Sequence, residues 1–259
     1  MRVLMIGDIV GKPGCDAICV LVPRIREERG IDFVIANGEN AEGGSGISTV
    51  IAKEMLKAGV DCITLGDHVY RRADVIPFLQ RSDRILKPAN LSPDSPGRGW
   101  TLLETAGGVP IGVGSLLGRL YMKPVDCPFR AADAILNELT PRAKLIFFDY
   151  HAEATGEKQA LGRYLDGRAT AVLGTHTHVA TADEQILPGG TGFQCDVGMT
   201  GPFASVLGRR VEPVVQFAIT QTPRPFPVAC DDVRLCGTIV EASPETGKAI
   251  WLERIMVRL

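Results

Sequence analysis

The chain has 259 residues, 45% of them hydrophobic, and a formal net charge of −2, as expected for a globular protein with a sizeable core. This near-neutral charge argues against duplex DNA or an anionic membrane as the main partner. No apolar run approaches the roughly 18 residues of a membrane span and no secretory signal is evident, while seven scattered cysteines without a C-x-x-C motif favour reduced thiols in a cytoplasm.

The first two thirds of the chain alternate between strand-like and helix-like stretches. The predicted strands, several of which run into a loop, cover 2–8, 32–40, 60–68, 84–91, 100–107, 109–118, 144–151 and 169–178. The predicted helices cover 13–29, 48–59, 72–81, 129–139 and 157–165. Pro13 suits the first turn of its helix, Gly30 is expected to end that helix, and Ser48 is a candidate N-cap. This alternation predicts a layered α/β fold with a largely parallel inner sheet.

The last third of the chain has a different pattern. Two strands at 233–243 and 249–259 flank the turn sequence PETGK, which predicts an antiparallel hairpin. The segment 200–228 is proline-rich and irregular, and its pattern assigns it no element. Because no repeat, low-complexity tract or linker interrupts the chain, we expect a single domain over 1–259.

Polar and charged side chains follow five of the predicted strands where each strand ends. They are Asp8, Glu39 with Asn40, Asp67 with His68, Asp149 with His151, and His176 with His178. In open α/β sheets the ligand site forms at the carboxyl ends of the strands. All four histidines of the chain are therefore expected at one edge, beside carboxylates and an amide.

Taken singly, these residues have ordinary structural explanations. Asp8 could cap the next helix, Glu39 and Asn40 could belong to a glycine-rich turn, and Asp149 could orient its neighbour His151. Together, converging carboxylates would repel one another unless a cation compensated their charge. Histidine and carboxylate ligands suit divalent manganese, iron or zinc, and six or seven ligands suit two ions rather than one tetrahedral ion.

His176 and His178 are two residues apart and would point to opposite faces of a continuing strand. Both can reach one site only if the backbone leaves the strand at Thr175, or if the site holds two ions. The spacing therefore favours a different ion for each histidine.

The order of these residues resembles that of the calcineurin-like metallophosphoesterase superfamily, and more closely the YmdB-type phosphoesterases of bacteria. The resemblance rests on long blocks, among them "GDIVGKPG", "VIANGENAEGGSGI", "DYHAEATGEKQALGRYLDGRATAVLGTHTHVATADEQILPGGT" and "DVGMTGP". It implies layered mixed β-sheets flanked by helices, and hydrolysis of cyclic-nucleotide phosphodiester bonds, including those of 2',3'-cyclic nucleotides. The implied cofactors are two divalent transition ions per chain, iron or manganese, with zinc as an alternative.

The resemblance also implies a role for each residue. A first metal would be held by Asp8, Glu39, Asn40 and His178. A second metal would be held by Glu39, the residue at position 67, His151 and His176, with Glu39 bridging the two ions. His68 would be the proton donor.

Two positions depart from the related sequences. Most of the superfamily has a histidine where this chain has Val10, so Asn40 is the candidate replacement ligand. Relatives usually have asparagine where this chain has Asp67. The carboxylate of Asp67 could ligate in the same way, or it could point away and pair with Arg71 or Arg72.

The expected reaction is metal-assisted hydrolysis of a small phosphodiester, with a hydroxide bridging the ions and a proton from His68 for the leaving group. An H-x-H pair also occurs in metal-dependent hydrolases of C–N bonds, but typically on an early strand. From another class, a regulatory protein could use the same metals to hold a nucleotide or an RNA end with little turnover. A homo-oligomer is expected.

Overall fold

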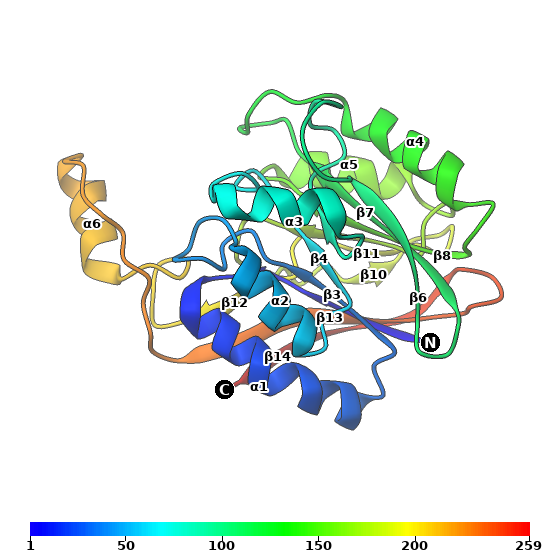
Figure 1. Ribbon diagram of the computed structural model, residues 1–259, viewed down its shortest axis with the longest axis horizontal. Coiled ribbons are helices and arrows are strands. Elements are labelled where there is room, and N and C mark those ends of the chain that lie inside the picture. Colours follow the sequence, from blue (N-terminus) through cyan, green and yellow to red (C-terminus); the bar gives the residue numbers. More distant parts are fainter.

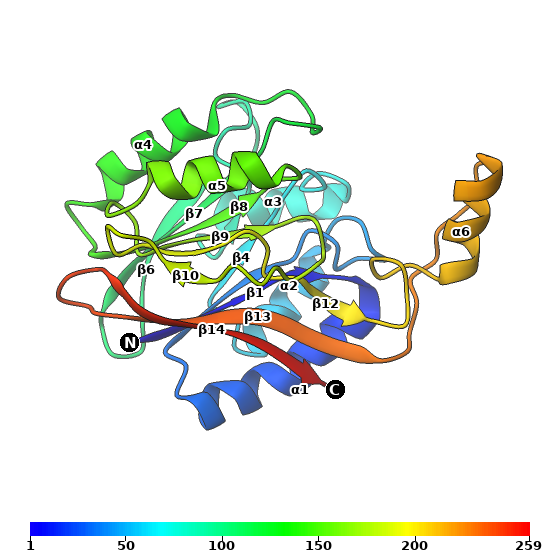
Figure 2. The same cartoon turned by 180° about the vertical axis from the view of Figure 1, so that it is seen from behind.

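Two β-sheets pack face to face, and helices cover the outer face of each sheet (Figure 1). The computed structural model describes all residues from Met1 to Leu259. Seen from behind, α4 and α5 cover one sheet, while α1 lies on the far side of the other (Figure 2). The predicted fold class, layered mixed sheets flanked by helices, is confirmed.

The first sheet has eight strands in the order β2-β12-β13-β1-β3-β4-β5, with β14 paired to β13. Its strands are β1 (Arg2–Ile6), β2 (Asp8–Ile9), β3 (Phe33–Asn37), β4 (Cys62–Thr64), β5 (Ile85–Leu86), β12 (Met199–Pro202), β13 (Val233–Ala242) and β14 (Ala249–Arg258). Strands β1, β3, β4 and β5 are parallel, whereas β13 runs antiparallel to β1. The predicted C-terminal hairpin forms, and its first strand inserts into the sheet beside β1.

The second sheet has six strands in the order β10-β11-β9-β8-β7-β6. Its strands are β6 (Trp100–Glu104), β7 (Pro110–Leu117), β8 (Leu145–His151), β9 (Ala171–Thr175), β10 (Gln185–Ile186) and β11 (Gly192–Gln194). The four central strands are parallel and the two edge strands are antiparallel to their neighbours. Each sheet therefore has a parallel centre within a mixed whole.

Strand β1 shows how the sequence builds these layers. Because successive side chains of a strand point to opposite faces, Leu4 and Ile6 join the core under the helices, while Val3 and Met5 join the core between the sheets. A strand buried on both faces reads as a continuous apolar run, which is the pattern of this segment.

The helices are α1 (Gly11–Arg29), α2 (Thr49–Lys57), α3 (Ile76–Arg81), α4 (Pro128–Leu139), α5 (Thr155–Tyr164) and α6 (Val211–Thr220). Helix α1 begins at Gly11 rather than at Pro13, and it ends as predicted at Gly30, whose φ of 60° is left-handed. The side chain of Ser48 accepts a hydrogen bond from the Ile51 amide, so it is the N-cap of α2. None of these helices combines the length and apolar character needed to cross a membrane.

Two parts of the chain differ from the sequence prediction. The strand predicted at 84–91 covers only Ile85–Leu86. It is followed by Pro88, which has no amide hydrogen to extend the ladder, and by a turn at 89–90. The segment 200–228, to which no element was assigned, contains the end of β12 and the helix α6. Helix α6 projects from the body of the molecule and has no buried residue (Figures 1 and 2).

Candidate metal centre

The carboxyl ends of parallel strands from both sheets meet at one edge of the sandwich. Asp8 begins β2 directly after β1, Glu39 and Asn40 follow β3, and Asp67 and His68 follow β4. From the second sheet, His151 ends β8, while His176 and His178 follow β9. The structure brings all eight predicted site residues together at this edge.

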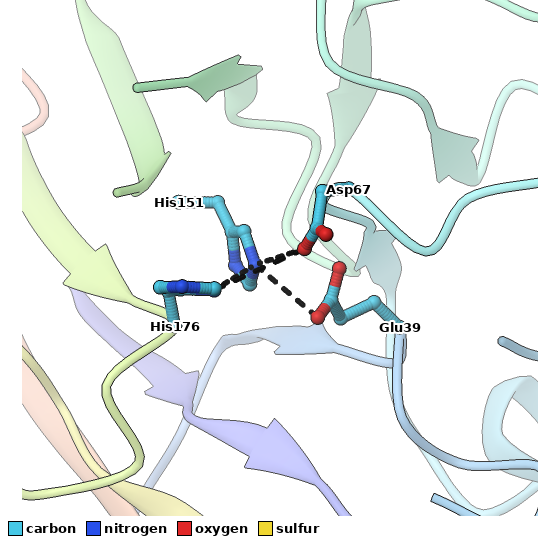
Figure 3. A group of neighbouring side chains, drawn as sticks. All are labelled: Glu39, Asp67, His151 and His176. Carbon is cyan, nitrogen blue, oxygen red and sulfur yellow. Dashed lines mark hydrogen bonds and ion pairs between the residues drawn. The ribbon is translucent and has the colours of Figure 1, made fainter. Parts of the chain in front are cut away.

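Four of these side chains form the tightest group (Figure 3). Each of Glu39, Asp67, His151 and His176 offers one ligand atom, and these atoms lie within 4.8 Å of one another. The Nε2 atom of His151 lies 3.2 Å from Glu39 Oε1, 3.5 Å from Asp67 Oδ1 and 3.0 Å from His176 Nδ1. Two carboxylates and two imidazoles at this spacing are a donor set for a divalent transition ion.

A second group lies on the other side of Glu39. The Nε2 atom of His178 is 3.9 Å from Asp8 Oδ1 and 3.2 Å from Asn40 Nδ2. The Asn40 amide also donates to Glu39 Oε1 over 3.1 Å. The carboxylate of Glu39 therefore lies between the two groups.

The backbone after β9 explains how His176 and His178 reach the same site. The strand ends at Thr175, and both histidines have positive φ angles, 99° and 65°. Such angles are uncommon for residues other than glycine and cost conformational energy. The backbone therefore leaves the strand where the i, i+2 spacing requires it.

The buried ion pair of Lys158 and Asp196 stabilises this turn. Lys158 Nζ donates to the Thr175 carbonyl over 2.7 Å and to Asp196 Oδ2 over 2.8 Å. The same Asp196 oxygen accepts hydrogen bonds from the amide and the hydroxyl of Thr177, at 3.0 and 2.8 Å. The residue between the two histidines is thereby fixed to the second sheet.

Gly66 leaves room for the cluster. A Cβ atom at this position would lie 2.3 Å from both His151 Nε2 and Glu39 Oε2. Any larger residue would push His151 and Glu39 away, so these two side chains can lie this close to the backbone only because position 66 is glycine.

Two buried oxygen atoms of the cluster lack hydrogen-bond partners. They are Asp8 Oδ1 and Asp67 Oδ1, both directed at the neighbouring histidines. Unpaired buried acceptors are rare in proteins, because each carries a desolvation cost. Together with the mixed imidazole and carboxylate donors, these orphaned oxygens fit the divalent ions that the resemblance implies.

The electrostatics of the cluster without ions show the same shortage of positive charge. Burial, together with the carboxylates of Asp196 and Glu39, raises the pKa of Asp8 to about 8 despite the opposing charge of His151. Burial alone would raise the pKa of Glu39, but His151 and His68 hold it well below its usual range. The pKa of His151 lies well above its usual value despite burial, because Glu39, Asp67 and Asp8 surround it.

His68 lies at the rim of the cluster, with 26% of its side chain exposed. Its Nδ1 atom is 3.0 Å from Asn40 Oδ1 and 3.2 Å from Glu39 Oε1, whereas Nε2 is 3.8 Å from Asp67 Oδ2. The hydrogen bond to Glu39 raises the pKa of His68, although its burial opposes this shift. The Nδ1 atom of His68 is thus held by two contacts, while Nε2 lies beyond hydrogen-bond distance of Asp67.

The structure also locates Val10 and Asp67, the two positions expected to differ from related sequences. Val10 is buried and apolar, so no nitrogen ligand stands at that position. Asp67 faces the histidines rather than solvent, and its side chain makes no ion pair with Arg71 or Arg72. The guanidinium of Arg72 instead donates to the Glu42 carbonyl.

Sequence reasoning missed the residues that support the histidines. Asp149 is buried and accepts hydrogen bonds from Asn37, Thr64 and Thr175. Burial raises the pKa of Asp149, while His151 and these three donors oppose the shift. Of these residues, the sequence pointed only to Asp149, as a residue that could orient His151. The two threonines and Asn37 lie in apolar strands and look like ordinary strand residues.

Comparisons with known proteins cover nearly the whole chain. The model of the YmdB-like protein family matches residues 4–255. The 2',3'-cyclic-nucleotide 2'-phosphodiesterase of Bacillus subtilis is 42% identical over 257 residues, which are 99% of this chain and 97% of that protein.

Two solved structures have the same fold. A hypothetical protein from Thermus thermophilus superposes with a TM-score of 0.93 at 41% identity, covering 100% of this chain and 99% of that one. A novel phosphatase from Mycoplasma pneumoniae superposes with a TM-score of 0.92 at 30% identity, covering 100% and 93%.

Proposed function

The chain belongs to the YmdB-like family, and on this basis we propose that it is a binuclear metal-dependent phosphodiesterase that hydrolyses cyclic nucleotides. The substrates we propose are 2',3'-cyclic nucleotides first and 3',5'-cyclic nucleotides second. The observation that carries the proposal is the convergence of seven potential ligands, two of which have buried oxygens without a hydrogen-bond partner. A further histidine, His68, lies beside them and is not among the potential ligands. The relative from Bacillus subtilis, named for the same activity, supports it.

Each potential ligand has a place in this proposal. Asp8, Asn40 and His178 would hold one ion, while Asp67, His151 and His176 would hold the other. Glu39, which lies between the two groups, would contact both ions. The ions would supply a water molecule acidified toward neutral pH and would neutralise the phosphate oxygens. Iron or manganese is the proposed metal, since both accept mixed nitrogen and oxygen donors.

His68 performs the proton transfer in this proposal. When water adds to phosphorus, the bond from phosphorus to a ribose oxygen breaks, and that oxygen must take up a proton. The anchored Nδ1 of His68 leaves Nε2 free to donate it. The products are a phosphate monoester and a free ribose hydroxyl, and His68 regains its proton from solvent.

The state of the cysteines supports a cytoplasmic location for this reaction. All seven cysteines are unpaired, and four of them are buried, which suits a reducing cytoplasm. We propose that the whole of 1–259 acts there as one catalytic unit.

The test compares two substrates in the wild-type chain and in His68→Ala. The protein should hydrolyse both 2',3'-cyclic AMP and bis-p-nitrophenyl phosphate after reconstitution with manganese. His68→Ala should lower kcat for 2',3'-cyclic AMP by about 10²–10⁴, the usual contribution of a general acid. The loss should be much smaller for bis-p-nitrophenyl phosphate, because p-nitrophenolate leaves without a proton.

Metal content should stay unchanged in His68→Ala. An equal loss of rate on both substrates would remove His68 from the role of general acid. Tight nucleotide binding without turnover would instead favour a regulatory binding protein.

A further inference from the structure

The three histidines of the cluster differ in what their outer nitrogen atoms contact. His151 Nδ1 lies 2.8 Å from the Thr175 hydroxyl, which in turn donates to Asp149 Oδ1 over 2.7 Å. Since the only hydrogen of that hydroxyl goes to Asp149, the hydroxyl must accept a hydrogen bond from His151 Nδ1–H. His151 therefore keeps a proton on Nδ1 and turns Nε2 toward the cluster, where it could bind an ion on losing its second proton. The buried carboxylate of Asp149 backs the ring through Thr175.

His176 is backed by a carboxylate directly. Its Nδ1 atom faces the cluster, 3.0 Å from His151 Nε2, and its Nε2 atom lies 3.1 Å from Glu153 Oε2. His178 has a neutral partner instead: its Nδ1 atom lies 3.3 Å from the Leu207 carbonyl oxygen. A carboxylate behind an imidazole fixes the tautomer and makes the ring a stronger ligand than a carbonyl does.

The carboxylate charge is the same at the two positions, but the neutral ligands differ. Glu39 is common to both groups. The group around His151 adds the carboxylate of Asp67, whereas the group around His178 adds the carboxylate of Asp8 and the neutral amide of Asn40. The nearby Asp196 adds no net charge to the group around His178, because it is paired with Lys158. One position thus has two carboxylate-backed histidines, and the other has a single histidine without such support.

We propose that the two metal positions are unequal: the position formed by Glu39, Asp67, His151 and His176 fills first and holds its ion at least about tenfold more tightly. Asp149, acting through Thr175, and Glu153 are the positioning residues that produce the difference. The ion at Asp8, Asn40 and His178 is the exchangeable one, so hydrolysis depends on the free metal concentration that fills this weaker position. This inference rests on the proposed binuclear function.

The test is a titration of the chelator-treated protein with Mn²⁺, followed by calorimetry and by metal analysis after equilibrium dialysis. Two steps of one ion each are expected, with affinities separated by about tenfold or more. Thr175→Val and Glu153→Gln should weaken the tight step about 10–100-fold and leave the weak step nearly unchanged. Asp8→Asn should weaken only the weak step.

Matched controls separate positioning from general effects on charge or folding. Thr175→Ser keeps the hydroxyl and should bind like the wild type. Glu138→Gln, which removes an exposed carboxylate from α4, should also bind like the wild type. If Thr175→Val does not fold, Glu153→Gln still tests the inference. Glu153 is 49% exposed, so its replacement by glutamine should not disturb the fold.

The outcomes are distinct from those that bear on the proposed function. Two ions of equal affinity, or a Glu153→Gln variant that weakens the later step, would overturn the inference while leaving the binuclear enzyme intact. A single ion at saturating Mn²⁺ would contradict the proposed function itself.

Discussion

At the residue scale, Asp67 brings a further carboxylate to the candidate metal centre. Its carboxylate faces His151 and His176, and one of its oxygens has no hydrogen-bond partner. With Asp8 and Glu39 it brings three negative charges to a site proposed to hold four positive charges. An asparagine here would leave one more net positive charge at the site.

Asp67→Asn is therefore expected to bind metal less tightly and phosphate more tightly. A more positive site attracts the phosphate anion and acidifies its water more strongly, so the pH–rate profile should move to lower pH. Inhibition by inorganic phosphate, measured for both forms at full metal loading, checks this. Equal inhibition constants and superimposable pH profiles would reject the charge argument.

Asp8 makes the stability of the metal-free protein depend on pH. Its pKa is raised from 3.8 to about 8, so the folded chain binds this proton more tightly than the unfolded chain does. The resulting stabilisation is complete at a pH below 3.8 and is lost as the pH rises through about 8. His151 and His68, whose pKa values are also raised, contribute in the same direction. His176 and His178, whose pKa values are lowered by burial, oppose it.

In chelator, the melting temperature should fall between about pH 5 and pH 8. Asp8→Asn should flatten this decline, because asparagine stays neutral throughout. Saturating Mn²⁺ should reverse it, since the ions stabilise the ionised carboxylate. Thermal unfolding of both forms across this range is the measurement, and a wild-type melting temperature independent of pH in chelator would contradict the account.

At the scale of elements, the turn after β9 depends on a contact from α5. Lys158 is almost fully buried, and its ammonium group joins the Thr175 carbonyl to Asp196. Removing one partner of a buried ion pair leaves the other charge uncompensated, which costs about 3–5 kcal/mol. The same loss would release the left-handed backbone of His176 and His178.

Lys158→Met should lower the free energy of unfolding by about 3–5 kcal/mol and reduce metal occupancy. The double variant with Asp196→Asn should be less destabilised than Lys158→Met alone, because it removes the unpaired charge. Exposed Lys144→Met serves as a control for the loss of a charge. Denaturant unfolding and metal analysis of the wild type, both single variants, the double variant and the control decide; if the effects of Lys158→Met and Asp196→Asn simply add, the pair is not the element that holds the turn.

At the scale of the whole molecule, local patterns predicted the elements better than their arrangement. The strand ends that carry Asp8, Glu39, Asp67 and His151 could be found because each follows an apolar run. The insertion of β13 beside β1 could not, because that pairing joins segments more than two hundred residues apart. Helix α6 was missed because prolines interrupt the segment on both sides of it, and Pro213 lies within its first turn.

The candidate site was predictable in its ligand types but not in its supports. The chain has only four histidines and all of them lie at or after the ends of predicted strands, so their recurrence is visible in the sequence. Thr175 and Thr64 are common strand residues, and their hydrogen bonds to Asp149 arise only when the two sheets pack together. The prediction of a homo-oligomer stays a prediction.

The central claim is that hydrolysis of a cyclic nucleotide requires two ions per chain. The most direct test is turnover of 2',3'-cyclic AMP measured against the number of ions bound, from the chelator-treated protein to full loading with Mn²⁺. The account predicts negligible turnover without ions, little with one, and full turnover as occupancy approaches two. Turnover that does not depend on bound metal, or a chain with two ions and no hydrolysis of 2',3'-cyclic AMP, would contradict it.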